Sequence, residues 1–231
     1  MKFNGSDSLS QRWALILAGG DGKRLLPLTR RIAGDDRPKQ FCAVLGNETL
    51  LHQTQRRVSQ LVQPQRTLLV LTRTHEPFYA DKVVGIPPSR LLIQPSNQGT
   101  APAILYSLLC LCEMDPKSVV AFFPSDHHFS DDEAFIGYID AAYAAAASRP
   151  EVVILLGIPP ETPEPEYGWI EPGAAATASY RGHESAQSPM VSSRTETIHW
   201  TRGVDARRIP ALRRTFTIFV SKAREWCTWE T

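Results

Sequence analysis

Long apolar runs are missing from this chain of 231 residues. None approaches the roughly 20 residues that a helix needs to span a bilayer, and the segment from Met1 to Gln11 is polar, without the apolar core of a signal peptide. A large excess of charge is missing too, because the formal net charge is only +1. Proteins that bind nucleic acid through their overall charge usually carry a basic excess. We therefore expect neither a membrane nor a nucleic acid as a partner.

Cysteines are few, and their spacing matches no metal-binding pattern. The four are Cys42, Cys110, Cys112 and Cys227. Cys110 and Cys112 lie in an apolar run of helical character, which predicts buried free thiols. Unpaired cysteines are typical of a reducing compartment, so we expect a cytoplasmic location. Hydrophobic residues make up 42% of the chain, which is enough for a folded core.

Apolar runs of strand length alternate with segments of helical character. Strands are predicted at 13–18, 67–71, 91–93, 119–123 and 152–156, and helices at 49–62, 101–114 and 132–147. Such alternation is typical of parallel βαβ units. We expect an α/β fold, a three-layer α/β/α sandwich with a mostly parallel, Rossmann-like sheet. Ligands of such sheets bind beyond the carboxyl ends of the strands.

Clustered glycines follow the first predicted strand, and cations follow the glycines. The segment runs Leu17, Ala18, Gly19, Gly20, Asp21, Gly22, Lys23 and Arg24. Glycine allows positive φ and a close approach of backbone N–H groups to an anion, and arginine adds a permanent charge. The alternative is a tight βα turn kept for packing alone, since the spacing is neither that of a P-loop nor that of a dinucleotide fingerprint. The adjoining cations favour phosphate binding.

Two charged side chains follow in loops. Lys39 lies beside Pro38 and is a candidate for contact with a transferring phosphate, although by itself this segment favours an ordinary surface lysine. Asp126 comes directly after the apolar run 119–123. A carboxylate there can hold Mg²⁺, which takes carboxylate and phosphate oxygens together. Capping of the next helix is the alternative for this aspartate.

Two polar loops complete the candidates. Gln94, Gly99 and Thr100 precede a predicted helix and are suited to contact a base edge, with Thr100 as the helix N-cap. A simple capping loop explains the same residues equally well. Gly168 and Glu171 lie among aromatic residues, a combination that suits sugar hydroxyl groups, while an edge strand with a paired glutamate is the alternative.

Taken in order, these segments resemble the sugar-1-phosphate nucleotidyltransferases. The family pattern Leu-x-Gly-Gly-x-Gly-x-Arg-Leu-x-Pro-Leu-Thr is present in full at 17–29. Four further segments are similar to the mannose-1-phosphate guanylyltransferase branch. They are Pro-Lys-Gln-Phe at 38–41, Thr-Ala-Pro-Ala-Ile at 100–104, Pro-Ser-Asp-His at 124–127 and Tyr-Gly-Trp-Ile-Glu at 167–171.

The resemblance implies transfer of a guanylyl group from GTP to mannose 1-phosphate, giving GDP-mannose and pyrophosphate. It assigns Arg24 to the pyrophosphate, Lys39 to the transferring phosphate and Asp126 to Mg²⁺. Leu17, Ala18 and the three glycines would cradle the nucleotide, and Gln94, Gly99 and Thr100 would flank the base. Gly168 and Glu171 would contact the sugar. The oligomeric state is left open, with a homodimer as one option.

Beyond Glu171 the chain departs from the family, because the expected Glu-Lys-Pro motif, tryptophan–asparagine stretch and second metal-binding aspartate are absent. Residues 172–231 hold nine basic and five acidic side chains and no asparagine, with one strand predicted at 215–220. We divide the chain into a nucleotidyltransferase domain, 1–172, and an incomplete or divergent sugar-binding lobe, 173–231. A truncated gene or a shifted reading frame would explain the tail. The alternatives are a catalytically impaired nucleotide-binding module and an enzyme for another nucleotide or sugar phosphate.

Overall fold

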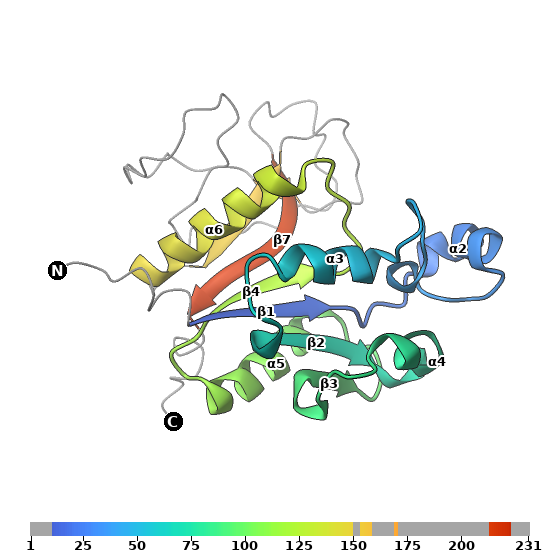
Figure 1. Ribbon diagram of the computed structural model, residues 1–231, viewed down its shortest axis with the longest axis horizontal. Coiled ribbons are helices and arrows are strands. Elements are labelled where there is room, and N and C mark those ends of the chain that lie inside the picture. Colours follow the sequence, from blue (N-terminus) through green and yellow to red (C-terminus); the bar gives the residue numbers. More distant parts are fainter. Residues whose placement is uncertain (1–10, 150–152, 159–168, 171–212, 223–231) are drawn as a thin grey trace.

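The computed structural model describes residues 11–149, 153–158, 169–170 and 213–222 (Figure 1). Its strands are β1 (Arg12–Leu17), β2 (Thr67–Thr72), β3 (Leu91–Gln94), β4 (Val119–Pro124), β5 (Ile154–Ile158), β6 (Trp169–Ile170) and β7 (Arg213–Lys222). Its α-helices are α2 (Leu26–Ala33), α3 (Leu50–Val58), α4 (Glu76–Tyr79), α5 (Thr100–Met114) and α6 (Asp132–Ser148). Three of its 3₁₀ turns border the candidate site: η1 (Lys23–Leu25), η2 (Lys39–Phe41) and η4 (Arg73–His75).

The described strands form one sheet in the order β3-β2-β1-β4-β7-β5, and β6 also pairs with β7. The four strands from β3 to β4 are parallel to one another. Strand β7 runs antiparallel to β4 on one side and to β5 on the other. The predicted mostly parallel sheet is confirmed. The antiparallel β7 between β4 and β5 was not expected from the alternating pattern, because this strand comes from a distant part of the chain.

Helices cover both faces of the sheet (Figure 1). Helices α3 and α6 pack on one face, with Leu51 and Phe135 in a buried cluster that includes Ile16 of β1. Helix α5 covers the other face, where Leu108 packs in a second cluster with Leu15. Neighbouring residues of β1 enter different clusters because side chains alternate between the faces of a strand. The predicted three-layer α/β/α sandwich is confirmed.

Two helices differ from the sequence prediction. Helix α3 ends at Val58, four residues before the predicted end, and Thr49 caps its start by accepting a hydrogen bond from His52 N at 3.2 Å. Helix α2 was not predicted from the sequence, where Pro27 is typical of a helix break. In the first turn of a helix, however, proline is well tolerated because its missing N–H has no partner there in any case. In the structure its apolar Ile32 is 45% exposed.

Strand β7 confirms the strand predicted at 215–220 and extends it at both ends. Its Val220 is paired with Ala121 of β4 and with Ile154 of β5. Part of the segment assigned to the second lobe therefore completes the sheet of the first. The division of the chain at residue 172 itself stays a prediction.

The prediction of buried free thiols at Cys110 and Cys112 in helix α5 is only partly right. Cys110 is a free thiol but only half-buried, and Cys112 is disulfide-bonded. The reason is the helical period: the buried stripe of α5 runs through Ser107, Leu108 and Leu111, so 110 and 112 lie on its flanks. None of the helices in the described part of the chain has the length and apolar character that a membrane span requires.

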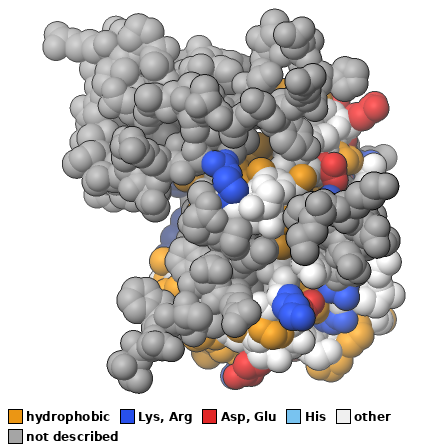
Figure 2. Space-filling model, turned by 90° about the vertical axis from the view of Figure 1, so that its left-hand side faces the viewer, with side chains coloured by type: hydrophobic (Ala, Val, Ile, Leu, Met, Phe, Trp, Pro, Cys, Tyr) orange, Lys and Arg blue, Asp and Glu red, His pale blue; other side chains and the backbone are white. Residues whose placement is uncertain are grey.

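Figure 2 looks onto the end of the molecule where the parallel strands begin. There Asp115 accepts hydrogen bonds from Trp13 Nε1 at 2.9 Å and from Arg66 Nη1 at 3.1 Å. On the described part of this face, basic, acidic and apolar side chains are interspersed (Figure 2). The candidate site lies at the other end, where the parallel strands finish.

Candidate active site

The carboxyl ends of the four parallel strands meet at one edge of the sheet. Leu17, the last residue of β1, is paired with Val70 of β2 and with Pro124 of β4. Thr72 at the end of β2 is paired with Gln94 at the end of β3. The segments that follow these strands, which carry most of the predicted site residues, therefore leave the sheet at the same edge.

Gln40 fixes the loop that follows β1. We call residues 18–22 the glycine loop. Gln40 is 3% exposed, and its side-chain Nε2 donates hydrogen bonds to the carbonyl oxygens of Ala18 at 3.0 Å and Gly20 at 2.7 Å. One amide group thus satisfies two loop carbonyls. This positioning role was missed in the sequence, where the glutamine was interpreted only as a mark of one family branch.

Two further side chains hold the glycine loop from the end of β2. Thr72 Oγ1 donates to the carbonyl oxygen of Gly19 at 2.9 Å. His75 Nε2 lies 3.3 Å from Asp21 Oδ1. Burial lowers the pKa of His75, while the charge and hydrogen bond of Asp21 act in the opposite direction. No sequence signal indicates these contacts, because each joins residues about fifty positions apart.

Gly22 brings Lys39 against the loop. Its φ is +61°, in the left-handed region that favours glycine. A Cβ at this position would lie 3.2 Å from the backbone nitrogen of Lys39. Glycine is needed here both for its backbone conformation and for the close approach of η2.

We predict that alanine at position 19 destabilises the protein and that alanine at position 20 does not. A Cβ on Gly19 would lie 2.7 Å from Thr72 Oγ1 and 3.1 Å from Gln94 Nε2, and Thr72 is fully buried. Gly19→Ala should lower the free energy of unfolding by about 1–3 kcal/mol, measured by urea denaturation. In Gly20→Ala the added Cβ meets nothing within 4 Å, so the change should stay within about 0.5 kcal/mol. Equal losses in the two variants would contradict this account of the packing.

Lys39 and Asp126, which are far apart in the sequence, meet at this edge of the sheet. Lys39 Nζ lies 2.6 Å from Asp126 Oδ2, and the two side chains are 27% and 26% exposed. The preceding residue, Ser125, donates to the carbonyl oxygen of Leu17 from its backbone N at 3.1 Å and from Oγ at 2.7 Å. These two bonds hold the chain before Asp126 beside the end of β1. The structure thus brings together the predicted lysine, the predicted carboxylate and the glycine loop.

His127 lies on the other side of the same carboxylate. Its Nε2 is 3.6 Å from Asp126 Oδ1. Burial lowers the pKa of His127, the charge of Asp126 raises it, and the charges of Lys39 and Arg57 lower it. The lowered pKa favours the neutral ring near pH 7. The neighbouring His128 is exposed.

The oxygen donors at this edge suit Mg²⁺ in one particular binding mode. Among the described residues, no group of three or more His, Cys, Asp and Glu side chains is arranged to hold a metal ion. Mg²⁺ commonly keeps several waters and is held by one or two carboxylates together with substrate phosphates. The carboxylate of Asp126, partly exposed beside the glycine loop, fits this mode. An all-protein metal cage does not fit the residues described.

The other predicted nucleotide-binding residues lie at or near the same edge. Arg24 lies in η1, directly after the glycine loop, with an exposed side chain. Gln94 ends β3 and lies close to Gly19. The prediction that Thr100 is the N-cap of α5 is wrong. The helix begins at Thr100, and Gly99 is the capping residue. Gly99 has a φ of +95° and donates its N–H to Asn97 Oδ1 at 2.9 Å, so the asparagine shapes the turn.

The predicted sugar-binding residues Gly168 and Glu171 lie outside the described residues. Their contact with a sugar stays a prediction. The same holds for contact of a nucleotide with Arg24, Gln94, Gly99 and Thr100.

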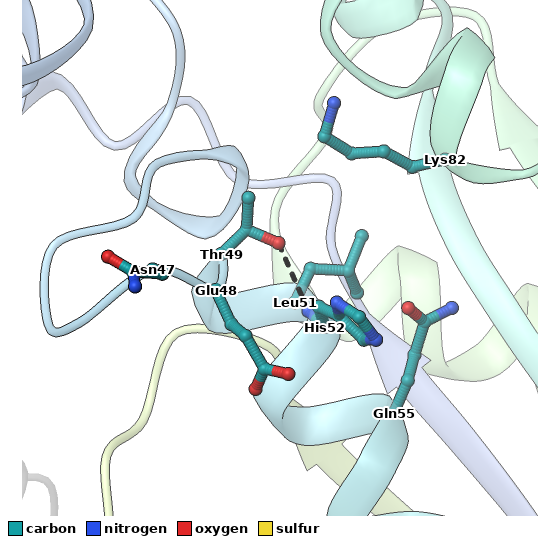
Figure 3. Close-up of a pocket in the computed structure, with 7 residues that line it drawn as sticks. All are labelled: Asn47, Glu48, Thr49, Leu51, His52, Gln55 and Lys82. Carbon is teal, nitrogen blue, oxygen red and sulfur yellow. Dashed lines mark hydrogen bonds between the residues drawn. The ribbon is translucent and has the colours of Figure 1, made fainter.

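A separate hollow of about 290 Å³ lies at the start of α3 (Figure 3). It is lined by Asn47, Glu48, Thr49, Leu51, His52, Gln55 and Lys82. In Figure 3, Lys82 stands apart from the side chains of α3 and the loop before it. None of the predicted site residues lines this hollow, so it is distinct from the edge that carries Lys39 and Asp126.

Residues 13–181 match the Nucleotidyl transferase family, and this chain belongs to that family. Among curated proteins, it is 34% identical over 167 residues to xanthan biosynthesis protein XanB of Xanthomonas campestris pv. campestris (strain B100), covering 71% of this chain and 34% of the relative. It is 31% identical over 176 residues to mannose-1-phosphate guanylyltransferase 2 of Escherichia coli O157:H7, covering 74% of this chain and 35% of the relative.

The fold is similar to a solved structure described as a mannose-1-phosphate geranyltransferase from Thermus thermophilus. The TM-score is 0.72 at 31% sequence identity, over 92% of this chain and 58% of the other. The chain spans about a third of the length of the curated relatives that it matches. The family and its fold are therefore shown, and the resemblance noted in the sequence is confirmed.

Proposed function

We propose that this chain transfers a guanylyl group from GTP to mannose 1-phosphate, giving GDP-mannose and pyrophosphate. The observation that carries the proposal is the meeting of Lys39 and Asp126 at 2.6 Å beside the glycine loop. A cation, a carboxylate and a glycine-rich turn at the carboxyl edge of an α/β sheet suit a polyphosphate. The choice of guanine and mannose is supported by the Pro-Lys-Gln-Phe segment and by relatives that carry the name mannose-1-phosphate guanylyltransferase.

Charge repulsion is the main obstacle to this reaction. An oxygen of the sugar phosphate attacks the α-phosphorus of GTP, and the bond from that phosphorus to the β-phosphate oxygen breaks. Two unit negative charges about 4 Å apart repel by about 4 kcal/mol at an effective dielectric constant near 20. Lys39 would offset charge on the transferring phosphate, and Arg24 would offset charge on the departing pyrophosphate. The substrate supplies the nucleophile, so the protein needs no nucleophilic side chain.

Asp126 would hold Mg²⁺ in this proposal, with the phosphates as its other ligands. The ion, when bound, supplies positive charge to the polyphosphate. The glycine loop would orient the nucleotide through its backbone, in a conformation kept by Gln40, Thr72 and His75.

The test is release of pyrophosphate. The purified chain is mixed with mannose 1-phosphate, Mg²⁺ and each of the four common nucleoside triphosphates in turn. We expect release with GTP, and release that requires both the sugar phosphate and the metal. Release with a different nucleotide would keep the reaction and change its substrate. No release with any of them would exclude the proposed activity for this chain.

A second candidate is a nucleotide-binding module with little or no turnover. It is favoured by the absence of the second metal-binding aspartate and of the Glu-Lys-Pro motif after Glu171. Nucleotide binding in a calorimeter without pyrophosphate release would support this candidate. A cytoplasmic location stays part of the first proposal, but it loses the support of unpaired cysteines because Cys112 is disulfide-bonded. The oligomeric state stays open, with a homodimer as one option.

A further inference from the structure

We propose that Lys39 acts as an internal counter-ion that keeps a lone divalent cation off Asp126. This inference rests on the proposed function, because it concerns the same carboxylate. It adds that metal binding is coupled to nucleotide binding: the carboxylate becomes available when a polyphosphate attracts the lysine.

The geometry of the carboxylate carries the argument. One oxygen, Oδ2, lies 2.6 Å from Lys39 Nζ, and the other, Oδ1, lies 3.6 Å from His127 Nε2. The oxygen Oδ2 is therefore already paired with an ammonium group, whereas the imidazole nitrogen lies beyond hydrogen-bond distance of Oδ1. Three-quarters of each of the side chains of Lys39 and Asp126 is shielded from solvent, so their attraction is screened less than that of an exposed pair.

The backbone of Lys39 is also held in place by its surroundings. It begins η2, and its backbone nitrogen lies against Gly22 of the glycine loop. The same turn carries Gln40, whose amide is bonded to two carbonyls of that loop. A side chain that starts from this fixed backbone can reach Asp126 or a phosphate on the loop by rotation alone. A divalent ion that arrives without phosphate has to compete with a tethered ammonium group.

The experiment measures the affinity for Mn²⁺ alone, without nucleotide or sugar phosphate. Mn²⁺ is paramagnetic, so free and bound ion are distinguished by electron paramagnetic resonance. We expect Lys39→Met to bind Mn²⁺ at least about tenfold more tightly than the unchanged protein, a gain of about 1.4 kcal/mol. The gain should disappear in the double variant Lys39→Met/Asp126→Asn, because the freed carboxylate is then absent.

The matched control is Lys82→Met. Lys82 also pairs with a carboxylate, Asp81, at 2.9 Å and is also 27% exposed, but it lines the separate hollow. We expect no change in Mn²⁺ affinity at the Asp126 site from this variant. Lys39→Gln, which keeps a polar side chain of similar reach, should reproduce the gain of Lys39→Met if the first variant folds poorly.

Unchanged or weaker Mn²⁺ binding in both Lys39 variants would overturn the inference, as would an equal gain in Lys82→Met. The outcome is independent of turnover. A gain without pyrophosphate release by the unchanged protein would keep the counter-ion role and reject the proposed reaction. If the unchanged protein releases pyrophosphate but the Lys39 variants bind Mn²⁺ no more tightly, the proposed reaction is kept and the counter-ion role is rejected.

Discussion

Asp126→Asn should abolish the part of the nucleotide affinity that depends on Mg²⁺. Asparagine keeps the shape of the side chain but loses the negative charge that attracts a divalent ion. GTP affinity measured by calorimetry should then be the same with Mg²⁺ as with a chelator. If the chain turns over, pyrophosphate release should fall at least about a hundredfold, equivalent to about 2.7 kcal/mol of barrier. Loss of the pair with Lys39, in which both side chains are about three-quarters shielded, should lower the free energy of unfolding by about 1–2 kcal/mol, between the values for exposed and fully buried pairs.

Asp131→Asn is the matched control for this variant. Asp131 belongs to the same loop after β4, and its Oδ1 accepts a hydrogen bond from Ala134 N at 2.8 Å as the cap of α6. Asparagine caps helices about as well as aspartate, so this variant removes one charge from the loop and keeps its structure. We expect its GTP affinity to retain the full response to Mg²⁺. A retained response in Asp126→Asn as well, at saturating Mg²⁺, would remove Asp126 from the site.

The edge of the sheet that carries the candidate site was predictable from the sequence because it depends on local signals. Apolar runs such as that ending at Leu17 and that ending at Phe123 are buried strands, and polar residues after them must lie at strand ends. In a parallel sheet these ends share one edge. That rule places Asp126, which follows β4 directly, at this edge. It does not place Lys39, which comes after helix α2 and reaches the edge because η2 packs against Gly22.

The residues that support the site were not predictable in the same way. Gln40, Thr72 and His75 act on the glycine loop through single contacts over long stretches of sequence. Nothing in the period or composition around His75 distinguishes it from an ordinary core histidine. Similarly, the run at 215–220 predicts a strand, but its antiparallel place between β4 and β5 depends on tertiary pairing.

A long-range ion pair between Arg57 and Asp132 holds the end of the loop that runs from Asp126 to the start of α6. Arg57 of α3 is 3% exposed in its side chain, and its Nε lies 2.6 Å from Oδ1 of Asp132, the first residue of α6. The guanidinium also lies 4.7 Å from the centre of the Phe129 ring and 5.6 Å from that of Phe135. The pair therefore ties together two helices and the loop between the site and α6.

Asp132→Asn should lower the free energy of unfolding by about 3 kcal/mol, because it leaves the buried charge of Arg57 without its partner. Urea denaturation of the purified variants measures this change. Asp36→Asn is the control, since Asp36 pairs with Arg30 where both side chains are 59% exposed, and loss of an exposed pair should cost no more than about 1 kcal/mol.

The double variant Arg57→Met/Asp132→Asn separates loss of the ion pair from loss of packing. If an isolated buried charge causes the damage, removing that charge should make the double variant more stable than Asp132→Asn alone, even though one more native side chain is gone. Methionine can occupy the space beside Phe129 and Phe135 without a charge. A double variant that is less stable than Asp132→Asn would instead assign the stability to the contacts of Arg57 with the two rings, and the ion pair would then be a minor contributor.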